Sequence, residues 1–397
     1  MSDSTTFETV KDLPKTHYVD NSIYTDQQIF ELEKEKIFNQ SWVLVCHESE
    51  VSDPGDYRVV QLFGGLSIII SRQKNGTLRA FHNICTHRGA KVTESLSGNC
   101  KSFQCPYHLW TFQTDGTLKG VTRPEAYEGT GFCKEKLNLT IAKVDSAFGF
   151  IFVSLNENVE PLKEFLGDEI LEHMKGPFGT EKLEVFHYHQ VVIDANWKQW
   201  MDNNTELYHE WLHYINRKTT KLMTGETDQR WFLYKNAHHV MKSETGQETQ
   251  IYDKGNLDSR NTNMFPTLNP NEFLLMHLFP DIMLNLRTTV LRLDRMVPLS
   301  PQKTLVEYRG LGLKSDSPDV RNMRIKHHNT FWGPNGRNIP EDFIAVQSQQ
   351  DAFITGGLKY SIFAREENLK PQDDANVRNF YQEWSRRMGL DASNPKI

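Results

Sequence analysis

Two short stretches that each pair a cysteine with a histidine constrain this chain more than any other feature. Cys85-x-His87 is followed, after 17 intervening residues, by Cys105-x-x-His108, so two loops each offer one thiolate and one imidazole. Two Cys and two His suit either a tetrahedral zinc ion or a [2Fe–2S] cluster, in which Cys holds one iron and His the other. Zinc fingers group a Cys pair and then a His pair, whereas each loop here is mixed. This order favours a cluster held between two loops.

The composition favours a metal role over disulfides for these cysteines. The chain has 5 Cys and 15 His, and its polar start lacks the basic and apolar segments of a secretory signal. An odd, sparse set of Cys in a protein expected to be cytoplasmic does not build a disulfide scaffold. The net charge is −6, and no apolar run approaches the roughly 20 residues that cross a bilayer. We therefore expect no nucleic-acid or membrane partner.

The pattern of apolar and turn residues divides the chain into three segments. Residues 1–42 are polar and then helical, because apolar residues recur three and four apart between Asp26 and Phe38, with Thr25 as a candidate N-cap. Residues 43–156 are short β runs separated by turn pairs such as Asn75-Gly76, which indicates an antiparallel β domain. Residues 157–397 combine long strands with helices. We expect the N-terminal segment to pack on this last domain.

The same periodicities give the elements of the last segment. Helices are expected at 161–174, 196–216, 339–356 and 373–388. Strands are expected at 185–193, 232–240, 272–277, 282–297 and 304–313. The expected fold class is therefore α+β: a small antiparallel β domain, then a domain whose antiparallel sheet is surrounded by helices.

The residues around the two Cys-His pairs resemble a known domain. Residues 85–90 (CTHRGA) and 105–112 (CPYHLWTF) resemble the Rieske domain of the Rieske non-haem iron oxygenases. The resemblance implies that Cys85, His87, Cys105 and His108 hold a [2Fe–2S] cluster. The family usually has glycine after the second His, where this chain has Leu109.

Residues 196–213 resemble the segment of the same family that holds a mononuclear iron. They include His209 and His213, which stand four apart and so share one face of a helix. Two His and one carboxylate form the facial triad that leaves positions open for O2. The family usually has four residues between its two His, whereas this chain has three. Asp202 and Asn203, in the same segment, are expected to belong to the catalytic site.

Two acidic positions complete the expected site. Glu206 stands three residues before His209, where the family has an acidic residue that links the mononuclear iron of one subunit to the cluster of its neighbour. The third iron ligand is expected at the start of the late helix. Asp342 is the choice there, with Glu341 and Asp351 as alternatives, because adjacent acids at a helix start also serve as partners of the helix dipole alone.

Two other classes of function stay open. Residues 209–213 (HEWLH) match the HExxH motif of zinc metallopeptidases, in which the Glu activates zinc-bound water. A peptidase leaves the Cys-His pairs unexplained, whereas an oxygenase uses both sets of residues. A non-catalytic Rieske electron carrier fused to a binding domain would lack the second iron.

The resemblance implies a terminal oxygenase α subunit. Its cluster would receive electrons from an NAD(P)H-dependent reductase, directly or through a ferredoxin, and pass them to Fe(II) held by His209, His213 and Asp342. One or both atoms of O2 would then enter a small organic substrate. In this family the two iron sites of one subunit lie too far apart for that transfer, so we expect a trimeric α core, either α3 or α3β3 with a small β subunit.

The substrate is less constrained. The resemblance favours an aromatic acid that is hydroxylated or dihydroxylated, while a small aliphatic substrate (a quaternary amine or an alkanesulfonate) and O- or N-demethylation are alternatives. Arg217, Arg287 and Arg292 are candidates either for pairing with a substrate carboxylate or sulfonate or for structural charges. Seven aromatic residues are candidates either for a pocket wall or for the core: Trp231, Phe232, Phe265, Phe273, Phe279, Phe331 and Trp332.

Overall fold

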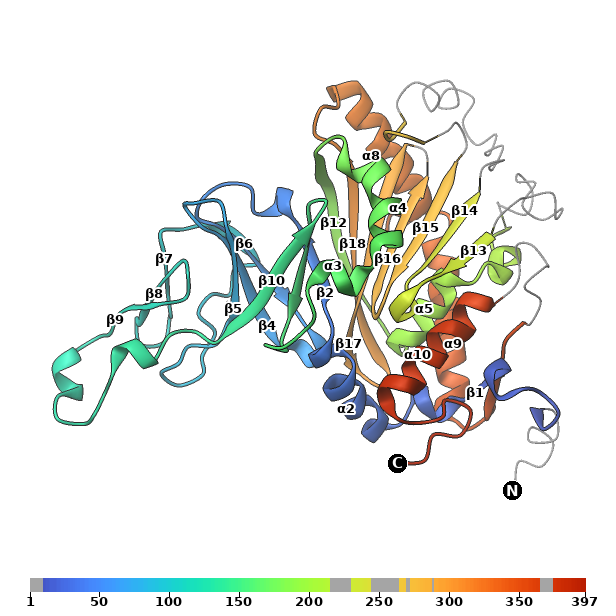
Figure 1. Ribbon diagram of the computed structural model, residues 1–397, viewed down its shortest axis with the longest axis horizontal. Helices are drawn as coiled ribbons and strands as arrows, with labels where there is room; N and C mark the ends of the chain where they lie inside the picture. The colour runs from blue at the N-terminus through green and yellow to red at the C-terminus, as the bar shows by residue number, and fades with distance from the viewer. Residues whose placement is uncertain (1–9, 215–229, 244–263, 269–271, 288, 365–373) are drawn as a thin grey trace. The chain divides into compact units, whose positions relative to one another are not determined.

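The computed structural model describes residues 10–214, 230–243, 264–268, 272–287, 289–364 and 374–397. The chain divides into two compact units. One is Asn39–Leu162, and the other joins Met1–Phe38 to Lys163–Ile397. Each unit is built on an antiparallel sheet, and the second unit also contains most of the helices (Figure 1). The expected α+β class is confirmed.

The smaller unit contains a seven-stranded sheet in the order β2-β11-β10-β5-β4-β3-β6 and a three-stranded sheet in the order β7-β8-β9. The strands are β2 (Val43–His47), β3 (Asp56–Gln61), β4 (Ser67–Arg72), β5 (Leu78–His82), β6 (Ser97–Asn99), β7 (Ser102–Gln104), β8 (Thr111–Gln113), β9 (Leu118–Gly120), β10 (Ile141–Ala147) and β11 (Phe150–Ser154). Phe81, Phe103 and Phe112 come from both sheets and share one buried cluster with Cys85 and Cys105. The hydrophobic core therefore holds both cysteines in place.

The larger unit is organised by a seven-stranded antiparallel sheet in the order β12-β18-β17-β16-β15-β14-β13. Its strands are β12 (Leu183–Ile193), β13 (Arg230–Leu233), β14 (His239–Ser243), β15 (Phe273–Leu278), β16 (Ile282–Arg287), β17 (Val290–Ser300) and β18 (Lys303–Leu313). A short pair, β1 (Tyr18–Asp20) with β19 (Tyr360–Ile362), lies apart from it. Strands β17 and β18 are buried along nearly their whole length, as expected for central strands covered on both faces.

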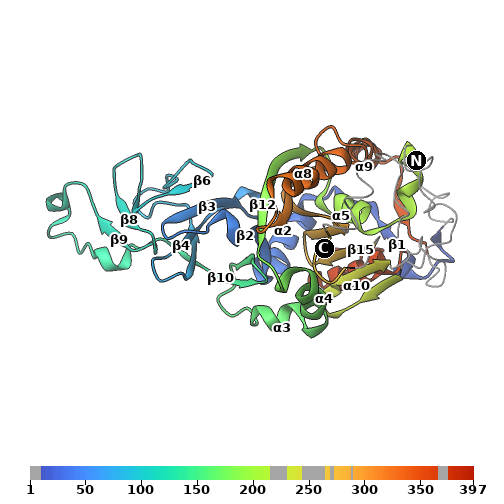
Figure 2. The same cartoon turned by 90° about the horizontal axis from the view of Figure 1, so that it is seen from above.

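Helices cover both faces of this sheet. Figure 2 shows α8 and α9 together on one face and α4 on the opposite face. The helices are α2 (Gln27–Lys36), α3 (Leu162–Leu166), α4 (Asp168–Gly179), α5 (Trp197–Thr205), α8 (Pro318–Trp332), α9 (Ile339–Ile354) and α10 (Ala375–Met388). No helix in the described part of the chain is both long and apolar enough to cross a membrane.

Two of the expected strands are hairpins. The expected strand 232–240 is β13 and β14, joined by a turn in which Asn236 has φ of 57°. The expected strand 282–297 is β16, which ends at Arg287, and β17, which begins at Val290. Neither turn contains Gly or Pro, the strongest turn signals in a sequence, so the pattern did not reveal the breaks.

The expected helices also need correction. The helix predicted over 161–174 is two helices, α3 and α4, interrupted at Gly167, which has φ of 81°. Helix α2 is capped by Asp26 in place of the expected Thr25, because the Asp26 side chain accepts the N–H groups of Gln28 and Ile29. Helix α8 was not expected.

A buried carboxylate on α2 fixes the helix from which the site is built. Glu33 is fully buried and accepts hydrogen bonds from Lys198 Nζ at 2.7 Å and Trp197 Nε1 at 2.8 Å, both on α5. It also accepts the Nε1–H of Trp384 on α10 at 2.8 Å. Breaking one partner of a buried ion pair costs about 3–5 kcal/mol. Glu33 therefore ties α2, α5 and α10 together.

Candidate active site

The two Cys-His loops of the smaller unit have the same backbone geometry. The N–H of Cys85 donates to the carbonyl five residues later at 2.8 Å, and the N–H four residues later donates back to the Cys85 carbonyl at 2.9 Å. Cys105 makes the same two hydrogen bonds at 2.9 and 3.0 Å. Each loop is thus closed by its own backbone. The pair places the rings of His87 and His108 side by side, with centroids 4.6 Å apart.

The thiols of these loops lie inside the protein and the imidazoles lie nearer to the surface. Cys85 and Cys105 are 3% and 2% exposed, whereas His87 and His108 are half-buried. Burial raises the pKa of the Cys85 thiol, and the neighbouring Cys105 raises it further, so paired thiolates here require a positive partner.

The spacing of the four side chains fits a cluster better than a single ion. One zinc ion would need the ligand atoms close to a common centre. Yet within the described ranges these residues supply no three ligand atoms that all lie within 4.8 Å of one another. A cluster with two Cys on one iron and two His on the other fits a buried Cys pair and an outer His pair.

Leu109 adopts a backbone conformation that favours glycine. Its φ is 60°, and the equivalent position of the first loop is Gly89, with φ of 79°. A residue with a Cβ costs about 1–2 kcal/mol in the left-handed region. The Leu109 side chain is 52% exposed, so little burial offsets this cost.

In the larger unit, the helix predicted over 196–216 ends early. Helix α5 stops at Thr205, and the backbone of Glu206 is extended, with φ of −92° and ψ of 148°. The Glu206 carboxylate then accepts the N–H of His209 at 2.9 Å and so caps a 3-10 turn over Tyr208–Trp211. His213 follows that turn. The expectation that both His share one α-helical face is wrong, and a peptidase motif, which needs that helix, loses its structural basis.

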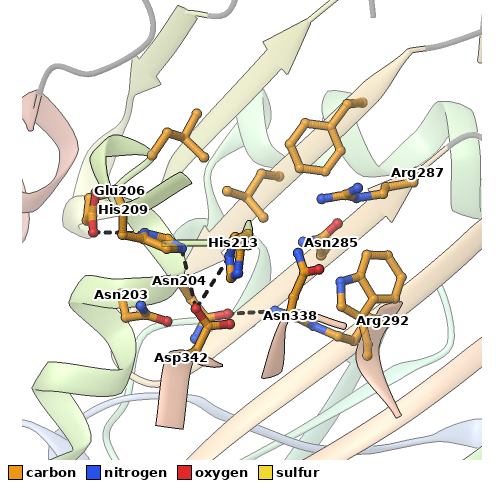
Figure 3. A pocket seen from close by; sticks show the side chains of 14 residues that line it. Asn203, Asn204, Glu206, His209, His213, Asn285, Arg287, Arg292, Asn338 and Asp342 are labelled. Carbon is orange, nitrogen blue, oxygen red and sulfur yellow. Dashed lines mark hydrogen bonds and ion pairs between the residues drawn. The ribbon is translucent and has the colours of Figure 1, made fainter. Parts of the chain in front are cut away.

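The turn brings His209 and His213 to Asp342 at the start of α9. Asp342 Oδ1 lies 3.7 Å from His209 Nε2 and 3.5 Å from His213 Nε2 (Figure 3). Among the described residues, these three form the only group of three or more His, Cys, Asp or Glu whose ligand atoms lie within 4.8 Å of one another. We refer to them as the triad.

The triad fits a bound cation. Asp342 Oδ1 is buried and accepts no hydrogen bond. Burial raises the pKa of the Asp342 carboxyl, and the imidazoles of His209 and His213 offset this only in part. A cation between the three side chains would satisfy the oxygen. Two His and one carboxylate are the donor set of non-haem Fe(II) sites.

Each imidazole is held on its other side by a second carboxylate. Glu206 Oε1 lies 2.8 Å from His209 Nδ1, and Glu341 Oε2 lies 2.9 Å from His213 Nδ1. A carboxylate at Nδ1 favours the tautomer with Nδ1–H and leaves Nε2 as the ligand atom. Glu341, which the sequence left as an alternative ligand, thus contacts the back of His213. This role was not anticipated.

The other acidic and amide candidates surround the triad in different roles. The Asp202 carboxylate accepts hydrogen bonds from two tyrosine hydroxyls, at 2.7 and 3.0 Å, and burial nevertheless raises its pKa to about 7. The Asn203 side chain hydrogen-bonds to Asp342 and lowers the pKa of that carboxyl. Asp351 lies on the exposed side of α9 and is not part of the triad.

A cavity of about 560 Å³, open to solvent, lies beside the triad. Of the candidate arginines, Arg287 and Arg292 line it, and Arg217 lies outside the described residues. Of the candidate aromatics, Phe273 and Trp332 line it.

Three asparagines that line the cavity were missed by the sequence analysis: Asn204, Asn285 and Asn338. One signal for them exists. In the buried strand β16 (IMLNLR), Asn285 and Arg287 are the only polar residues, and they stand two apart. Polar residues at strand spacing inside an apolar run indicate a polar patch on one sheet face.

Comparison with known proteins covers nearly the whole chain. Residues 41–137 match the Rieske [2Fe-2S] domain, and residues 180–390 match the catalytic domain of the ring hydroxylating alpha subunit. The chain is a Rieske oxygenase α subunit. It is an oxidoreductase, and its two domains imply a Rieske cluster and a mononuclear non-haem iron. The peptidase and electron-carrier alternatives are therefore set aside.

Two relatives of this oxygenase are similar along their full length. The α subunit of 2-aminobenzenesulfonate 2,3-dioxygenase from Alcaligenes sp is 39% identical, with 96% of each chain covered. The hydroxylase α subunit of methanesulfonate monooxygenase from Methylosulfonomonas methylovora is 37% identical, over 97% of this chain and 94% of that one.

Solved structures share the fold. A quaternary ammonium Rieske monooxygenase superimposes with a TM-score of 0.77 at 25% identity, covering 95% of this oxygenase and 98% of that chain. Naphthalene 1,2-dioxygenase from Rhodococcus sp. superimposes with a TM-score of 0.78 at 23% identity, covering 97% of both chains. At these identities the likeness concerns the fold.

Proposed function

We propose that His209, His213 and Asp342 hold the mononuclear Fe(II) of this oxygenase, and that Cys85, His87, Cys105 and His108 hold its [2Fe–2S] cluster. The observation that carries the first assignment is the buried Asp342 oxygen, which accepts no hydrogen bond and faces both His Nε2 atoms. When bound, this iron supplies the site at which O2 is reduced and inserted into the substrate. The protein's part is to keep both Nε2 atoms unprotonated through the carboxylates at Nδ1.

We further propose that electrons arrive through Glu206. Glu206 and His209 line the triad cavity and also a second depression of about 870 Å³. On the wall of that depression, Tyr208 and Ile362 are 62% and 52% exposed. A cluster-bearing loop of a neighbouring subunit at this depression would meet Glu206 directly, and Glu206 would link it to His209. In one of the structural relatives, electrons pass between subunits.

This route requires an assembly and an electron donor. We propose a trimeric α core in which each cluster serves the next subunit, with or without a small β subunit. We propose that an NAD(P)H-dependent reductase supplies the electrons, directly or through a ferredoxin. Both full-length relatives are named as α subunits of larger enzymes.

In this proposal, each of the three segments defined from the sequence has its own role. Residues 43–156 form the cluster domain, residues 157–397 form the catalytic domain, and residues 1–42 form a helical segment that packs on the catalytic domain. The contacts of Glu33 with Lys198 and Trp384 support the last assignment.

Metal analysis together with turnover tests the function. The purified protein should contain iron and not zinc, with two irons in the cluster and one in the triad. With reductase and NADH it should consume O2 and form a product whose mass is raised by one or two oxygen atoms. Zinc in the triad, or full activity of a well-folded monomer, would refute the iron assignment or the inter-subunit route, respectively.

A further inference from the structure

The cavity beside the triad has a polar wall that contains two positive charges. Asn285 and Arg287 stand two residues apart on β16 and so project from the same face of the sheet. Arg292, on β17, is the register partner of Asn285. All three line the cavity, and Figure 3 shows them on the side opposite Glu206.

Arg292 is occupied within the protein. Its Nη2 donates to Asn204 Oδ1 at 2.6 Å, and its Nε lies 2.8 Å from the buried Asp294 carboxylate. These contacts connect β17 to α5. Arg292 is therefore part of the scaffold, and its removal would disturb more than ligand binding.

Arg287 is held in a different way. Its guanidinium carbon lies 5.0, 5.6 and 5.3 Å from the ring centroids of Phe273, Phe331 and Trp332, respectively. Aromatic faces hold a guanidinium through its charge and its plane, whereas oxyanions bind along its N–H edge. The rings thus fix Arg287 in position in a manner compatible with an additional oxyanion.

Asn285 adds a polar group beside Arg287. It is 7% exposed, and its amide oxygen accepts no hydrogen bond. Buried polar atoms without a partner are rare in proteins and ask for an explanation. Because the orientation of an amide follows from its hydrogen bonds, Asn285 can turn either its oxygen or its NH2 towards a ligand.

We propose that Arg287, assisted by Asn285, binds the anionic head group of the substrate, a sulfonate or a carboxylate. The carbon skeleton then lies along the apolar wall formed by Phe273 and Leu275, with its reacting carbon turned to the triad. Guanidinium groups bind such oxyanions by two parallel hydrogen bonds, which fixes orientation as well as position. This inference rests on the proposed oxygenase function and names its substrate class.

The same wall disfavours a cationic substrate. Quaternary ammonium groups are recognised by aromatic faces, but here Arg287 occupies three such faces and Arg292 lies 5.1 Å from the ring of Trp332. The positive charge of Arg287 would also repel a cation. The names of the two full-length relatives, which act on sulfonates, agree with an anionic head group.

Matched pairs of anions and neutral amides test the proposal in the holoenzyme with its reductase. The pairs are benzenesulfonate and benzenesulfonamide, methanesulfonate and methanesulfonamide, and 2-aminobenzoate and 2-aminobenzamide. Wild-type enzyme should oxidise at least one anion in preference to its amide. Arg287→Gln should raise the KM for that anion by about 10- to 100-fold, the range for hydrogen bonds to charged groups, with a smaller change in kcat and no change for the amide.

Two further variants serve as references. Arg287→Lys keeps the charge without the two-pronged geometry and should lie between wild type and Arg287→Gln. Arg321→Gln removes the same charge from α8, where the guanidinium pairs with Glu184 at 2.8 Å outside the cavity, and should match wild type. An unchanged cluster spectrum and iron content show that each variant is folded.

The outcomes separate this inference from the proposed function. A larger loss for the sulfonates than for the carboxylate identifies sulfonate as the head group, and the reverse identifies carboxylate. An equal effect of Arg287→Gln on anion and amide, or no effect on either, overturns the role of Arg287 while the oxygenase function stands. An iron-loaded wild-type enzyme that oxidises only the neutral amides also overturns it. Absence of the mononuclear iron would instead overturn the proposed function.

Discussion

Replacement of Glu341 tests the support of iron binding without changing the proposed path of electrons through Glu206. Glu341 Oε2 lies 2.9 Å from His213 Nδ1, and its side chain is 33% exposed. An acceptor at Nδ1 fixes the ring and makes Nε2 a stronger ligand. Glu341→Gln keeps an acceptor but removes the charge, whereas Glu341→Ala removes both.

The expected loss of iron affinity follows from this contact. Loss of such a partner costs roughly 10- to 100-fold in metal affinity, or about 1.4–2.7 kcal/mol. Since Glu341 is one-third exposed, water replaces part of the lost hydrogen bond. We therefore expect Glu341→Gln near the lower end of the range and Glu341→Ala nearer the upper end.

Anaerobic titration of the apo-triad protein with Fe(II), followed by turnover with reductase and NADH, measures the effect. In the Glu341 variants, excess Fe(II) should restore kcat, and the visible spectrum of the cluster should not change. The matched control is Glu206→Gln, which alters the same type of contact, 2.8 Å from His209 Nδ1, but at the proposed electron bridge. Excess Fe(II) should not restore its kcat.

Two results would contradict this reasoning. Wild-type iron affinity in Glu341→Ala would show that the hydrogen bond does not support the ligand. Full recovery of Glu206→Gln by added Fe(II) would show that Glu206 acts only as a partner of His209.

Three further changes test other parts of the structure. His213→Ala should remove the triad iron and abolish oxygenation while the cluster spectrum remains, and turnover by the variant would show that the triad is misassigned. Leu109→Gly should raise the free energy of unfolding by about 1 kcal/mol and Gly89→Ala should lower it by a similar amount, because the two positions have φ of 60° and 79°. The temperature at which the cluster absorbance is lost measures both effects. Shifts of the same sign in the two variants would contradict the backbone argument. Burial would raise the pKa of Glu307, but two buried arginines and two hydrogen bonds outweigh it and lower the pKa to about 2. A carboxyl pKa that is lower in the folded than in the unfolded protein stabilises the folded state. At pH values above the unfolded pKa of about 4.3 this contribution is on the order of 3 kcal/mol, and roughly half of it is lost by pH 3. Denaturant unfolding should therefore show a larger cost of Glu307→Gln at pH 7 than at pH 3, and an equal cost at both would refute the assigned pKa.

The local sequence was enough to predict those parts of the structure that are held by contacts between residues close together in the chain. Each Cys-His loop is fixed by two backbone hydrogen bonds within six residues, so its spacing alone indicated a cluster site. Long helices such as α9 and α10 were predicted to within a few residues, since their periodicity and starts are local properties. The hairpins at 232–240 and 282–297 were not predicted, because their turns contain neither Gly nor Pro.

The sequence by itself determined the fold class, the family and the set of side chains from which the two metal sites are proposed. Only the tertiary structure decided how the residues of the proposed mononuclear iron site are arranged. The helix after Asn196 ends at Thr205 because Glu206 turns its carboxylate to the N–H of His209. Which of the adjacent acids faces the imidazoles depends on how α9 meets that turn, from about 130 residues further along the chain. Asp342 faces the Nε2 atoms of both His, and Glu341 contacts Nδ1 of His213.

The same distinction applies to the arginines. In the sequence Arg287 and Arg292 are equivalent candidates five residues apart. In the sheet, one is enclosed by three aromatic rings and the other is bonded to Asn204 and Asp294. These partners come from α5, β15, β17 and α8, and only the packing of those elements, which no local pattern encodes, makes one arginine a candidate substrate anchor and the other a structural charge.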